Sequence, residues 1–348
     1  MDRLGFFKQG LSSLFDAAST VVGLKQAVNS FTDVVDEALS NIKTDIGLHL
    51  PSLDAGMYDD PQGTIAGVAQ AGYSMVEVGS YYNGKVHDMS PEKLKELAHK
   101  AGLKITSAHL NHLYEKPAEE EAEVQGAEMQ AEAEAQTEAE AQAKAEVQTE
   151  VVEQKVEVTT EAEAEKVEKI APNDEWWCKA LDIHKELGCK YIVMSRLPDY
   201  PTDEVVAEYA TYFNRIGEIT AERGMQFCYH PRQQELKMQE GKSAFETIVA
   251  NTDPEKVHFE IDTYEAAEAG VDVNELLKRL TKRVTLLHIH DYGIVGESEK
   301  IDFEKIIAEG IRTGVKDIFV EVRNFSLPPM NCVERSFYNV ESLPSISY

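Results

Sequence analysis

The chain has 348 residues, which is enough for one barrel domain of about 250 residues with additions, and its hydrophobic content of 43% allows a large core. The formal net charge of −28 disfavours nucleic acid as a partner, because phosphates would be repelled and the sequence has no dense Lys/Arg cluster. We expect no membrane span, since no run of apolar residues is long enough, and four cysteines without a CxxC pair predict reduced thiols.

Residues 1–44 are predicted to form an N-terminal amphipathic helical extension, because apolar residues recur at helical spacing from Val21 to Leu39. Lys25 and Gln26 interrupt the best candidate for a signal-peptide core. We therefore expect a cytoplasmic protein, with export to the periplasm through a degenerate leader as the alternative.

From Asp45 onward the sequence alternates strand and helix, a pattern that predicts an α/β fold with a parallel sheet. Expected helix starts lie at Asp60, Ser90 and Thr202, and glycines follow the expected helix ends. Eight predicted strands match a (β/α)8 TIM barrel made of residues 45–114 and 171–348. The strands are expected near 45–50, 75–79, 104–109, 190–195, 225–230, 256–262, 284–290 and 317–323.

Residues 115–170 interrupt this alternation after the third strand. The stretch is rich in Glu, Ala and Gln, and residues 115–169 hold 18 Glu against 5 Lys, so they carry 13 of the 28 net negative charges. Few large apolar groups are available to offset the entropy of ordering, which predicts an acidic insertion that is disordered or loosely helical. A partner-binding or metal-buffering arm, or a crude lid over the barrel, is the functional alternative.

Four polar residues lie at or near the ends of the last four predicted strands: His230, Asp262, His288 and Glu321. Successive members are 32, 26 and 33 residues apart, about one strand-plus-helix unit, so the four are expected to converge at one end of the barrel. Facing the helix layer would be costly for such groups, whereas the barrel mouth offers water, a metal or a substrate.

With these residues in place, the chain resembles the sugar phosphate isomerase/epimerase family, whose members have xylose isomerase-like barrels. The resemblance covers residues 45 to about 325 without the insertion. It is carried by the order and spacing of IGLHLPSL, LKITSAHL, LGCKYIVMS, FCYHPRQQEL, FEIDTYEAAEAGVDV, LLHIHDY and IFVEVRNF.

The resemblance implies one divalent metal ion at the barrel mouth, held by residues from strands five to eight. By position these ligands are His230, Asp262, His288 and Glu321. Such a nitrogen and oxygen donor set suits Mn²⁺, Co²⁺, Fe²⁺ or Zn²⁺, and Mg²⁺ stays open, as does the identity of the metal. The chain departs from the family where His230 replaces a frequent Glu.

The activity that the resemblance implies is metal-dependent isomerisation or epimerisation of a sugar, keto-sugar or cyclitol, by removal of a proton next to a metal-bound carbonyl. Glu321 is the candidate base. A second acid or base would be Glu235, Glu260, His109 or His290, and we single out Glu235 and His290.

Substrate-binding roles are predicted for His49, Glu77 and His109, which share the inward parity of the first three strands. Arg232 and Arg323 could neutralise a phosphate or carboxylate, or form structural ion pairs. The expected partner is thus a small carbohydrate, and the resemblance leaves a homodimer open.

Two alternatives keep the same barrel: a dehydratase similar to inosose dehydratase, and a non-catalytic carbohydrate-binding protein. A nuclease resembling endonuclease IV is disfavoured by the net charge.

Overall fold

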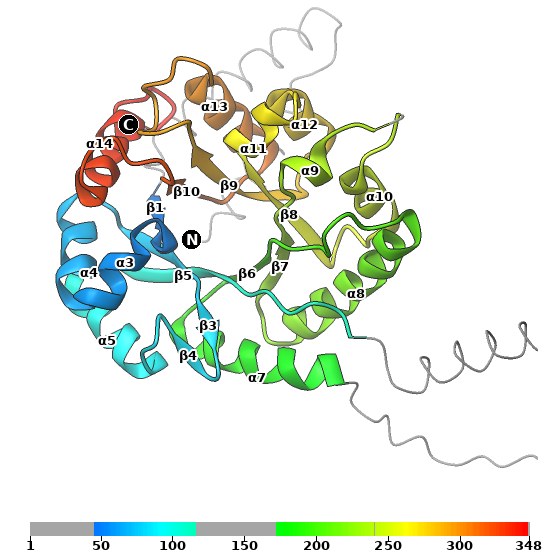
Figure 1. Ribbon diagram of the computed structural model, residues 1–348, viewed down its shortest axis with the longest axis horizontal. Helices are drawn as coiled ribbons and strands as arrows, with labels where there is room; N and C mark the ends of the chain where they lie inside the picture. The colour runs from blue at the N-terminus through cyan, green and yellow to red at the C-terminus, as the bar shows by residue number, and fades with distance from the viewer. Residues whose placement is uncertain (1–44, 116–171, 240, 347–348) are drawn as a thin grey trace, which may run out of the picture.

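The computed structural model describes residues 45–115, 172–239 and 241–346, and it shows a closed barrel of parallel strands (Figure 1). The strand order around the barrel is β1-β10-β9-β8-β7-β6-β5-β2, so each of the eight predicted strands is confirmed. The strands are β1 (Ile46–His49), β2 (Met75–Val78), β5 (Lys104–His109), β6 (Tyr191–Met194), β7 (Gln226–Tyr229), β8 (Val257–Asp262), β9 (Val284–His290) and β10 (Asp317–Glu321).

Helices surround the barrel, and Figure 1 shows them as an outer ring. They are α4 (Pro61–Gln70), α5 (Pro91–Ala101), α7 (Pro172–Leu187), α8 (Asp203–Glu222), α10 (Ala244–Asn251), α12 (Val273–Arg279), α13 (Phe303–Thr313) and α14 (Pro329–Glu341). Shorter elements lie in the loops that follow strands: η1 (Leu50–Leu53), α3 (Asp54–Asp59), the hairpin β3 (Tyr81–Tyr82) and β4 (Lys85–Val86), α9 (Gln233–Leu236) and α11 (Thr263–Glu268).

The predicted helix starts are confirmed by side-chain caps. Asp60 accepts a hydrogen bond from the backbone N–H of Gly63, Ser90 from that of Lys93, and Thr202 from that of Val205. These caps satisfy backbone N–H groups that have no partner within the helix. The local sequence therefore sets where α4, α5 and α8 begin.

The lower part of the barrel interior is apolar. Its side chains form one buried cluster: Met75, Tyr191, Val193, Cys228, Leu286 and Phe319. Gly47 leaves room for the ring of Phe319, because a Cβ at this position would lie 2.3 Å from Cδ1 of Phe319. A ring can fill the barrel axis here only because β1 has no side chain at that point.

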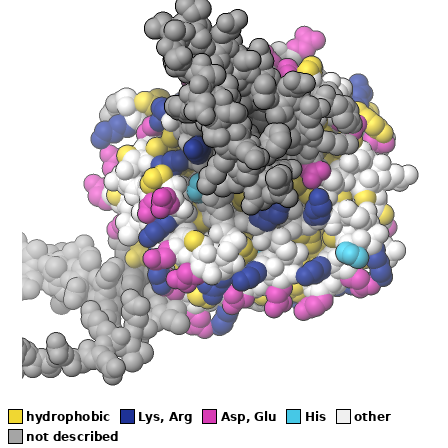
Figure 2. Space-filling model, turned by 180° about the vertical axis from the view of Figure 1, so that it is seen from behind, with side chains coloured by type: hydrophobic (Ala, Val, Ile, Leu, Met, Phe, Trp, Pro, Cys, Tyr) yellow, Lys and Arg dark blue, Asp and Glu magenta, His cyan; other side chains and the backbone are white. Residues whose placement is uncertain are grey.

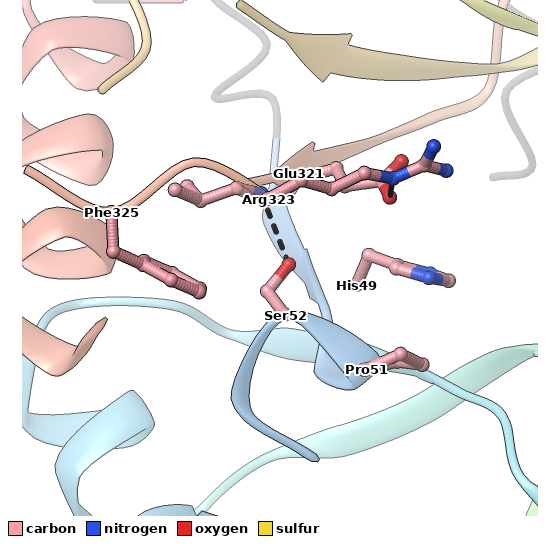
Figure 3. Close-up of a pocket in the computed structure, with 7 residues that line it drawn as sticks. His49, Pro51, Ser52, Glu321, Arg323 and Phe325 are labelled. Atoms are coloured by element: carbon pink, nitrogen blue, oxygen red, sulfur yellow. Dashed lines mark hydrogen bonds and ion pairs between the residues drawn. The ribbon is translucent and has the colours of Figure 1, made fainter. Parts of the chain in front are cut away.

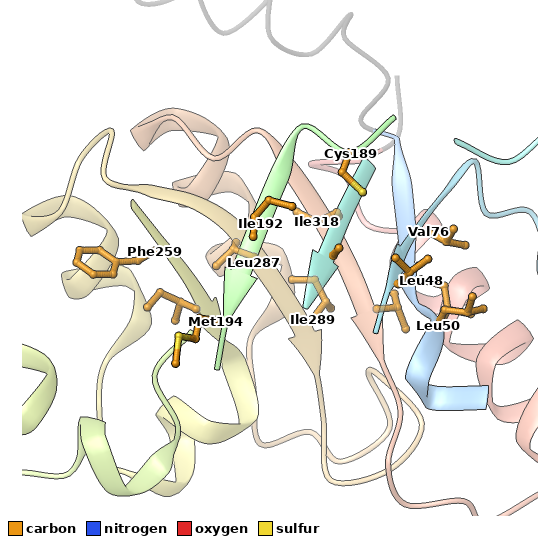
Figure 4. Close-up of a cluster of buried hydrophobic side chains, with 14 of the residues drawn as sticks. Leu48, Leu50, Val76, Cys189, Ile192, Met194, Phe259, Leu287, Ile289 and Ile318 are labelled. Carbon is orange, nitrogen blue, oxygen red and sulfur yellow. The ribbon is translucent and has the colours of Figure 1, made fainter. Parts of the chain in front are cut away.

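The opposite face of the strands packs against the helices in a second and larger apolar cluster, part of which is shown in Figure 4. Leu48, Val76, Ile192, Leu287 and Ile318 belong to it, each with at most 2% of its surface exposed. Every strand is therefore covered on both faces, as expected for a parallel sheet.

The predicted N-terminal extension and nearly all of the acidic insertion lie outside the described residues. Glu115, its first residue, is described, and it contacts Asn173 in α7. The backbone N–H of Glu115 donates to Oδ1 of Asn173 at 3.1 Å, and Nδ2 of Asn173 donates to the backbone carbonyl of Glu115 at 2.7 Å. The chain thus leaves and re-enters the barrel at one point.

None of the helices in the described ranges is long and apolar enough to cross a bilayer. Figure 2 shows the side of the molecule turned away from the view in Figure 1, where basic and acidic side chains of the described residues are interspersed.

Candidate metal centre and substrate pocket

Ionisable side chains replace the apolar ones two residues further along the same strands. Glu77, His230, His288 and Glu321 follow Met75, Cys228, Leu286 and Phe319 by two residues, so they point to the same inner face. The predicted inward orientation is therefore observed. These groups lie at the carboxyl ends of the strands, where TIM barrels carry their active sites.

Glu77 is fully buried and connects its own strand, β2, to three others. Its Oε1 lies 2.7 Å from Nδ1 of His49 and 2.7 Å from Nε2 of His288, and its Oε2 accepts a 2.6 Å hydrogen bond from Ser107. Both carboxylate oxygens of Glu77 therefore already have hydrogen-bond partners. Glu77 fixes the rings of His49 and His288, whose centroids are 4.7 Å apart.

Glu260 is the second fully buried carboxylate of the cluster. Its Oε2 lies 2.9 Å from Nε2 of His109 and 3.1 Å from Nδ1 of His230. Its Oε1 lies 3.3 Å from Nε2 of His288, but without the geometry of a hydrogen bond, so this buried oxygen has no hydrogen-bond partner.

On the other side of His288 lies a group formed by Asp262, His290 and Glu321. Nδ1 of His288 is 2.9 Å from Oε2 of Glu321, and Nδ1 of His290 is 2.9 Å from Oδ2 of Asp262. The second oxygen of Asp262 caps helix α11 by accepting from the N–H of Glu265. Arg323 pairs with Glu321 and, at 3.1 Å, with Glu265, so its ion pairs hold the Glu321 carboxylate in place.

Charge balance determines the protonation of this network. Burial by itself lowers the pKa of His109, but the neighbouring carboxylates of Glu77 and Glu260 outweigh it and raise the pKa to about 9. Burial likewise opposes ionisation of Glu77 and Glu321, yet the surrounding histidines hold the pKa of both carboxyl groups well below its usual range. The carboxylates thus remain charged and require positive charge beside them.

The residues present fit a divalent metal ion. Imidazole nitrogens and carboxylate oxygens are suitable donors for Mn²⁺, Fe²⁺, Co²⁺ or Zn²⁺, and two buried donor atoms, Oε1 of Glu260 and Nε2 of His290, have no hydrogen-bond partner. The four predicted ligands divide between two groups of close donors: His230 and His288 lie in one, and Asp262 and Glu321 in the other. His288 and Glu321 join the two groups through their hydrogen bond.

Two adjoining cavities open above these side chains. One of about 340 Å³ is lined by His49, Ser52, Glu321, Arg323 and Phe325, among others. In Figure 3 the side chains of Arg323 and Glu321 extend in the same direction, with Phe325 at the other end of the pocket. The Ser52 hydroxyl accepts a hydrogen bond from the N–H of Val322 at 3.1 Å, which ties the loop after β10 to η1.

The second cavity, of about 210 Å³, is more polar. Its lining includes Asn111, Ser195 and the guanidinium-bearing Arg232, together with His109 and His230. His49 and Arg323 border both cavities. Hydroxyl, amide and guanidinium groups around a concave site suit a polyhydroxylated ligand.

Four of the five predicted substrate-binding residues therefore line a cavity, whereas Glu77 lies beneath them. Glu235, predicted as catalytic, is placed differently: its carboxylate accepts from the backbone N–H of Arg232, the residue that precedes α9. His290, also predicted as catalytic, is 1% exposed and lines neither cavity.

The contacts of Ser107 and Glu265 were missed by sequence reasoning. Ser107 lies two residues before His109 on the same strand and so points to the same inner face, and this was the available signal in the sequence. Glu265 contacts the barrel mouth through Arg323, and no periodic pattern in the sequence predicts that contact.

Residues 160–327 match the family model described as the xylose isomerase-like TIM barrel. This chain has the xylose isomerase-like TIM-barrel fold. A sugar phosphate isomerase/epimerase from Parabacteroides distasonis superposes on it with a TM-score of 0.68, at 24% identity, over 88% of this chain and 99% of that one. The predicted resemblance is therefore confirmed at the level of the fold.

Sequence similarity to curated proteins covers a shorter part of the barrel. An inosose dehydratase from Mesomycoplasma hyopneumoniae is 30% identical over 153 residues, which are 38% of this chain and 48% of that protein. The chain thus spans about half the length of the curated relatives it matches. The IolI protein, whose structure holds a bound zinc atom, has a TM-score of 0.56 at 12% identity over 88% of this chain and 99% of that one.

Proposed function

We propose that this barrel is a metal-dependent isomerase or epimerase of a sugar, keto-sugar or cyclitol, with Glu321 as the group that removes the carbon-bound proton. The observation that carries the proposal is the position of Glu321. Its carboxylate lines the 340 Å³ cavity and also contacts the ring of His288, a candidate metal ligand, at 2.9 Å. Glu321 therefore borders the cavity and contacts a candidate metal ligand at the same time.

A divalent ion, when bound, polarises the carbonyl group next to the C–H bond that is broken. The ion pair with Arg323 restricts the orientation of Glu321, and the surrounding histidines keep its carboxylate ionised by holding its pKa well below the usual range, as a proton acceptor requires. His49 borders both cavities, and Glu77 behind it fixes the ring at 2.7 Å. His49 is thus the second group placed to give or take a proton at the substrate.

For isomerisation, Glu321 is the one base needed at carbon: it removes a proton from one carbon and returns it to the neighbouring one, while the proton of the adjacent hydroxyl group moves to the carbonyl oxygen. Epimerisation needs a second group on the opposite face of the sugar, and His49 is available for that role. Arg232, for which the described part of the chain shows no ion pair, is placed in the 210 Å³ cavity to bind an anionic group of the substrate.

The test is incorporation of solvent deuterium into a panel of aldoses, ketoses and ketocyclitols, measured by NMR on metal-loaded protein. We expect exchange at the carbon next to the carbonyl, and a rate about 10²–10⁴ lower in Glu321→Gln. Glu235→Gln is the informative comparison, because both variants remove one buried carboxylate. Loss of exchange in Glu235→Gln alone would move the base to Glu235.

Dehydration is the second candidate, and the partial match to inosose dehydratase favours it specifically. It begins with the same proton removal at Glu321, followed by departure of a hydroxyl group that His49 protonates. Mass spectrometry of the product separates the two reactions, since dehydration removes one water and isomerisation leaves the mass unchanged. Bound metal without exchange or water loss in any compound would contradict both and favour a carbohydrate-binding role.

A further inference from the structure

Large hydrophobic side chains are exposed mainly on the face of the barrel that carries the mouth. Among the described residues, they lie between the carboxyl end of a barrel strand and the next helix of the outer ring, with Tyr338 in α14 as the exception. Tyr58 follows β1, Tyr82 follows β2, Tyr200 follows β6 and Phe325 follows β10. Exposed apolar groups that gather around a concave site indicate a ligand or partner with an apolar part.

Phe325 is the one of these side chains that lines the 340 Å³ cavity, and 42% of its surface is exposed. Within the described part of the chain, its ring belongs to neither of the two apolar clusters. The ring therefore contributes little to the packing of the barrel. An apolar group of a bound molecule that covers this ring removes apolar surface from water, which favours binding.

The loop that carries Phe325 is held on both sides of the ring. Directly before it, Nδ2 of Asn324 donates to the backbone carbonyl of Tyr292 at 3.3 Å. After it, the thiol of Cys332 donates to the backbone carbonyl of Leu327 at 3.5 Å. The backbone around Phe325 is thus fixed before a ligand binds, which lowers the entropic cost of binding.

The 340 Å³ cavity differs in chemistry from one end to the other. In Figure 3 the ring of Phe325 lies on one side of Ser52, whereas His49 and the charged ends of Glu321 and Arg323 lie on the other side. Its volume is within the range of about 300–1,000 Å³ that is typical of pockets for drug-sized ligands, and the 210 Å³ cavity adjoins it. The site therefore has room for an apolar group beside a sugar ring.

We propose that the substrate is a glycoside, with its sugar ring at His49 and Glu321 and with an aromatic aglycone, the group joined to the sugar, against the ring of Phe325. This inference rests on the proposed function, because the base Glu321 marks the end of the cavity where the sugar lies. Two aromatic rings attract each other in offset or edge-to-face arrangements, so Phe325 selects such a glycoside over the free sugar. A glycosidic bond keeps the sugar ring closed, and the carbonyl group that proton removal requires is then a ketone on the ring.

The test is the affinity of matched methyl and phenyl β-D-glycosides of glucose, galactose and xylose, measured by calorimetry on the metal-loaded full chain. In at least one pair we expect the phenyl glycoside to bind about 10-fold more tightly, and this preference should fall below about 2-fold in Phe325→Ala. Phe325→Tyr keeps the aromatic ring and should keep the preference. Leu327→Ala is the matched control, since Leu327 is equally exposed on the same loop but lines neither cavity, and it should also keep the preference.

Equal affinity within every pair, no measurable binding of any phenyl glycoside, or a phenyl preference that Phe325→Ala leaves unchanged would overturn the proposal. Thermal melts of the three variants should match that of the unmodified protein, because both residues are exposed and lie outside the two apolar clusters.

Deuterium exchange on the same preparations separates this inference from the proposed function. Exchange in a free sugar together with equal affinity within every pair contradicts only the glycoside. A phenyl preference that is lost in Phe325→Ala, without exchange in any compound, contradicts only the enzymatic function and leaves the place of the aglycone intact.

Discussion

Two layers of the barrel interior differ in chemistry although they lie on the same strands. In the lower layer, Leu286 and Phe319 are packed among apolar neighbours. Two residues further along β9 and β10, His288 and Glu321 contact each other and, in turn, Glu77 and Arg323. Both layers are buried, so burial does not separate the part of the barrel that stabilises the fold from the part that can act chemically. The presence of charged partners separates these two parts.

The comparison predicts that stability depends most on the lower layer. Phe319→Ala would remove a fully buried ring and leave a cavity on the barrel axis, at a cost of about 3–5 kcal/mol in the free energy of unfolding. The metal affinity of the molecules that remain folded should stay within a few-fold. Urea unfolding with metal titration checks both, and a loss of metal binding at full stability would contradict the separation of the layers.

The upper layer should respond in the opposite way. His288→Ala removes a ring that touches Glu77 and Glu321, and we expect metal affinity to fall by at least about 100-fold, since even outer-shell partners of a metal ligand contribute about 10–100-fold. Leu286→Ala on the same strand is the matched control. Competition with a chelator measures the affinity, and equal losses in the two variants would mean that the effect is only structural.

A buried histidine outside the barrel mouth shows how charged partners change the protonation of an imidazole ring. His184 in α7 is fully buried beside Tyr81, and its Nδ1 contacts the backbone carbonyl of Ala180. Burial lowers the pKa of His184 to about 4, whereas the carboxylates around His109 raise the pKa of that residue to about 9. The same ring is thus held neutral in one place and charged in the other.

Acid should therefore destabilise the protein through His184. The stability that neutral His184 contributes is fully present above pH 6.5 and is lost as pH falls towards 4, because the unfolded chain binds the proton first. The free energy of unfolding falls by at most about 3 kcal/mol. His184→Gln should show a shallower decline of the melting temperature over this range. The exposed His99→Gln serves as control, and identical pH profiles for the two variants would exclude this origin.

The smallest effect is expected for removal of the insertion. Because Glu115 and Asn173 already bond to each other, replacing residues 117–170 by a short Gly/Ser linker should change the free energy of unfolding by less than about 1 kcal/mol. Thermal melts and turnover check this. An unchanged melt with a collapse of turnover would instead support a lid function for the inserted segment.

Much of the fold and part of the site follow from the sequence. Caps such as Ser90 and Thr202 are local, so the helix starts could be predicted from neighbouring residues alone. Strand parity placed His230, His288 and Glu321 on the inner face, and they lie there. The roles of Glu235 and Glu260 could not be ranked in this way. Both are buried carboxylates, and only their partners, a helix cap for Glu235 and three histidines for Glu260, distinguish them.

The sequence by itself determined the barrel, because hydrophobic periodicity, caps and strand count are properties of short segments that act independently of their distant neighbours. Only the tertiary structure decided how the donors group: His288 lies between Glu321 and Glu260, and Asp262 pairs with His290. Which donor atoms meet depends on register, ring orientation and side-chain contacts across the barrel. These distances of a few ångströms arise only when all strands close around one axis.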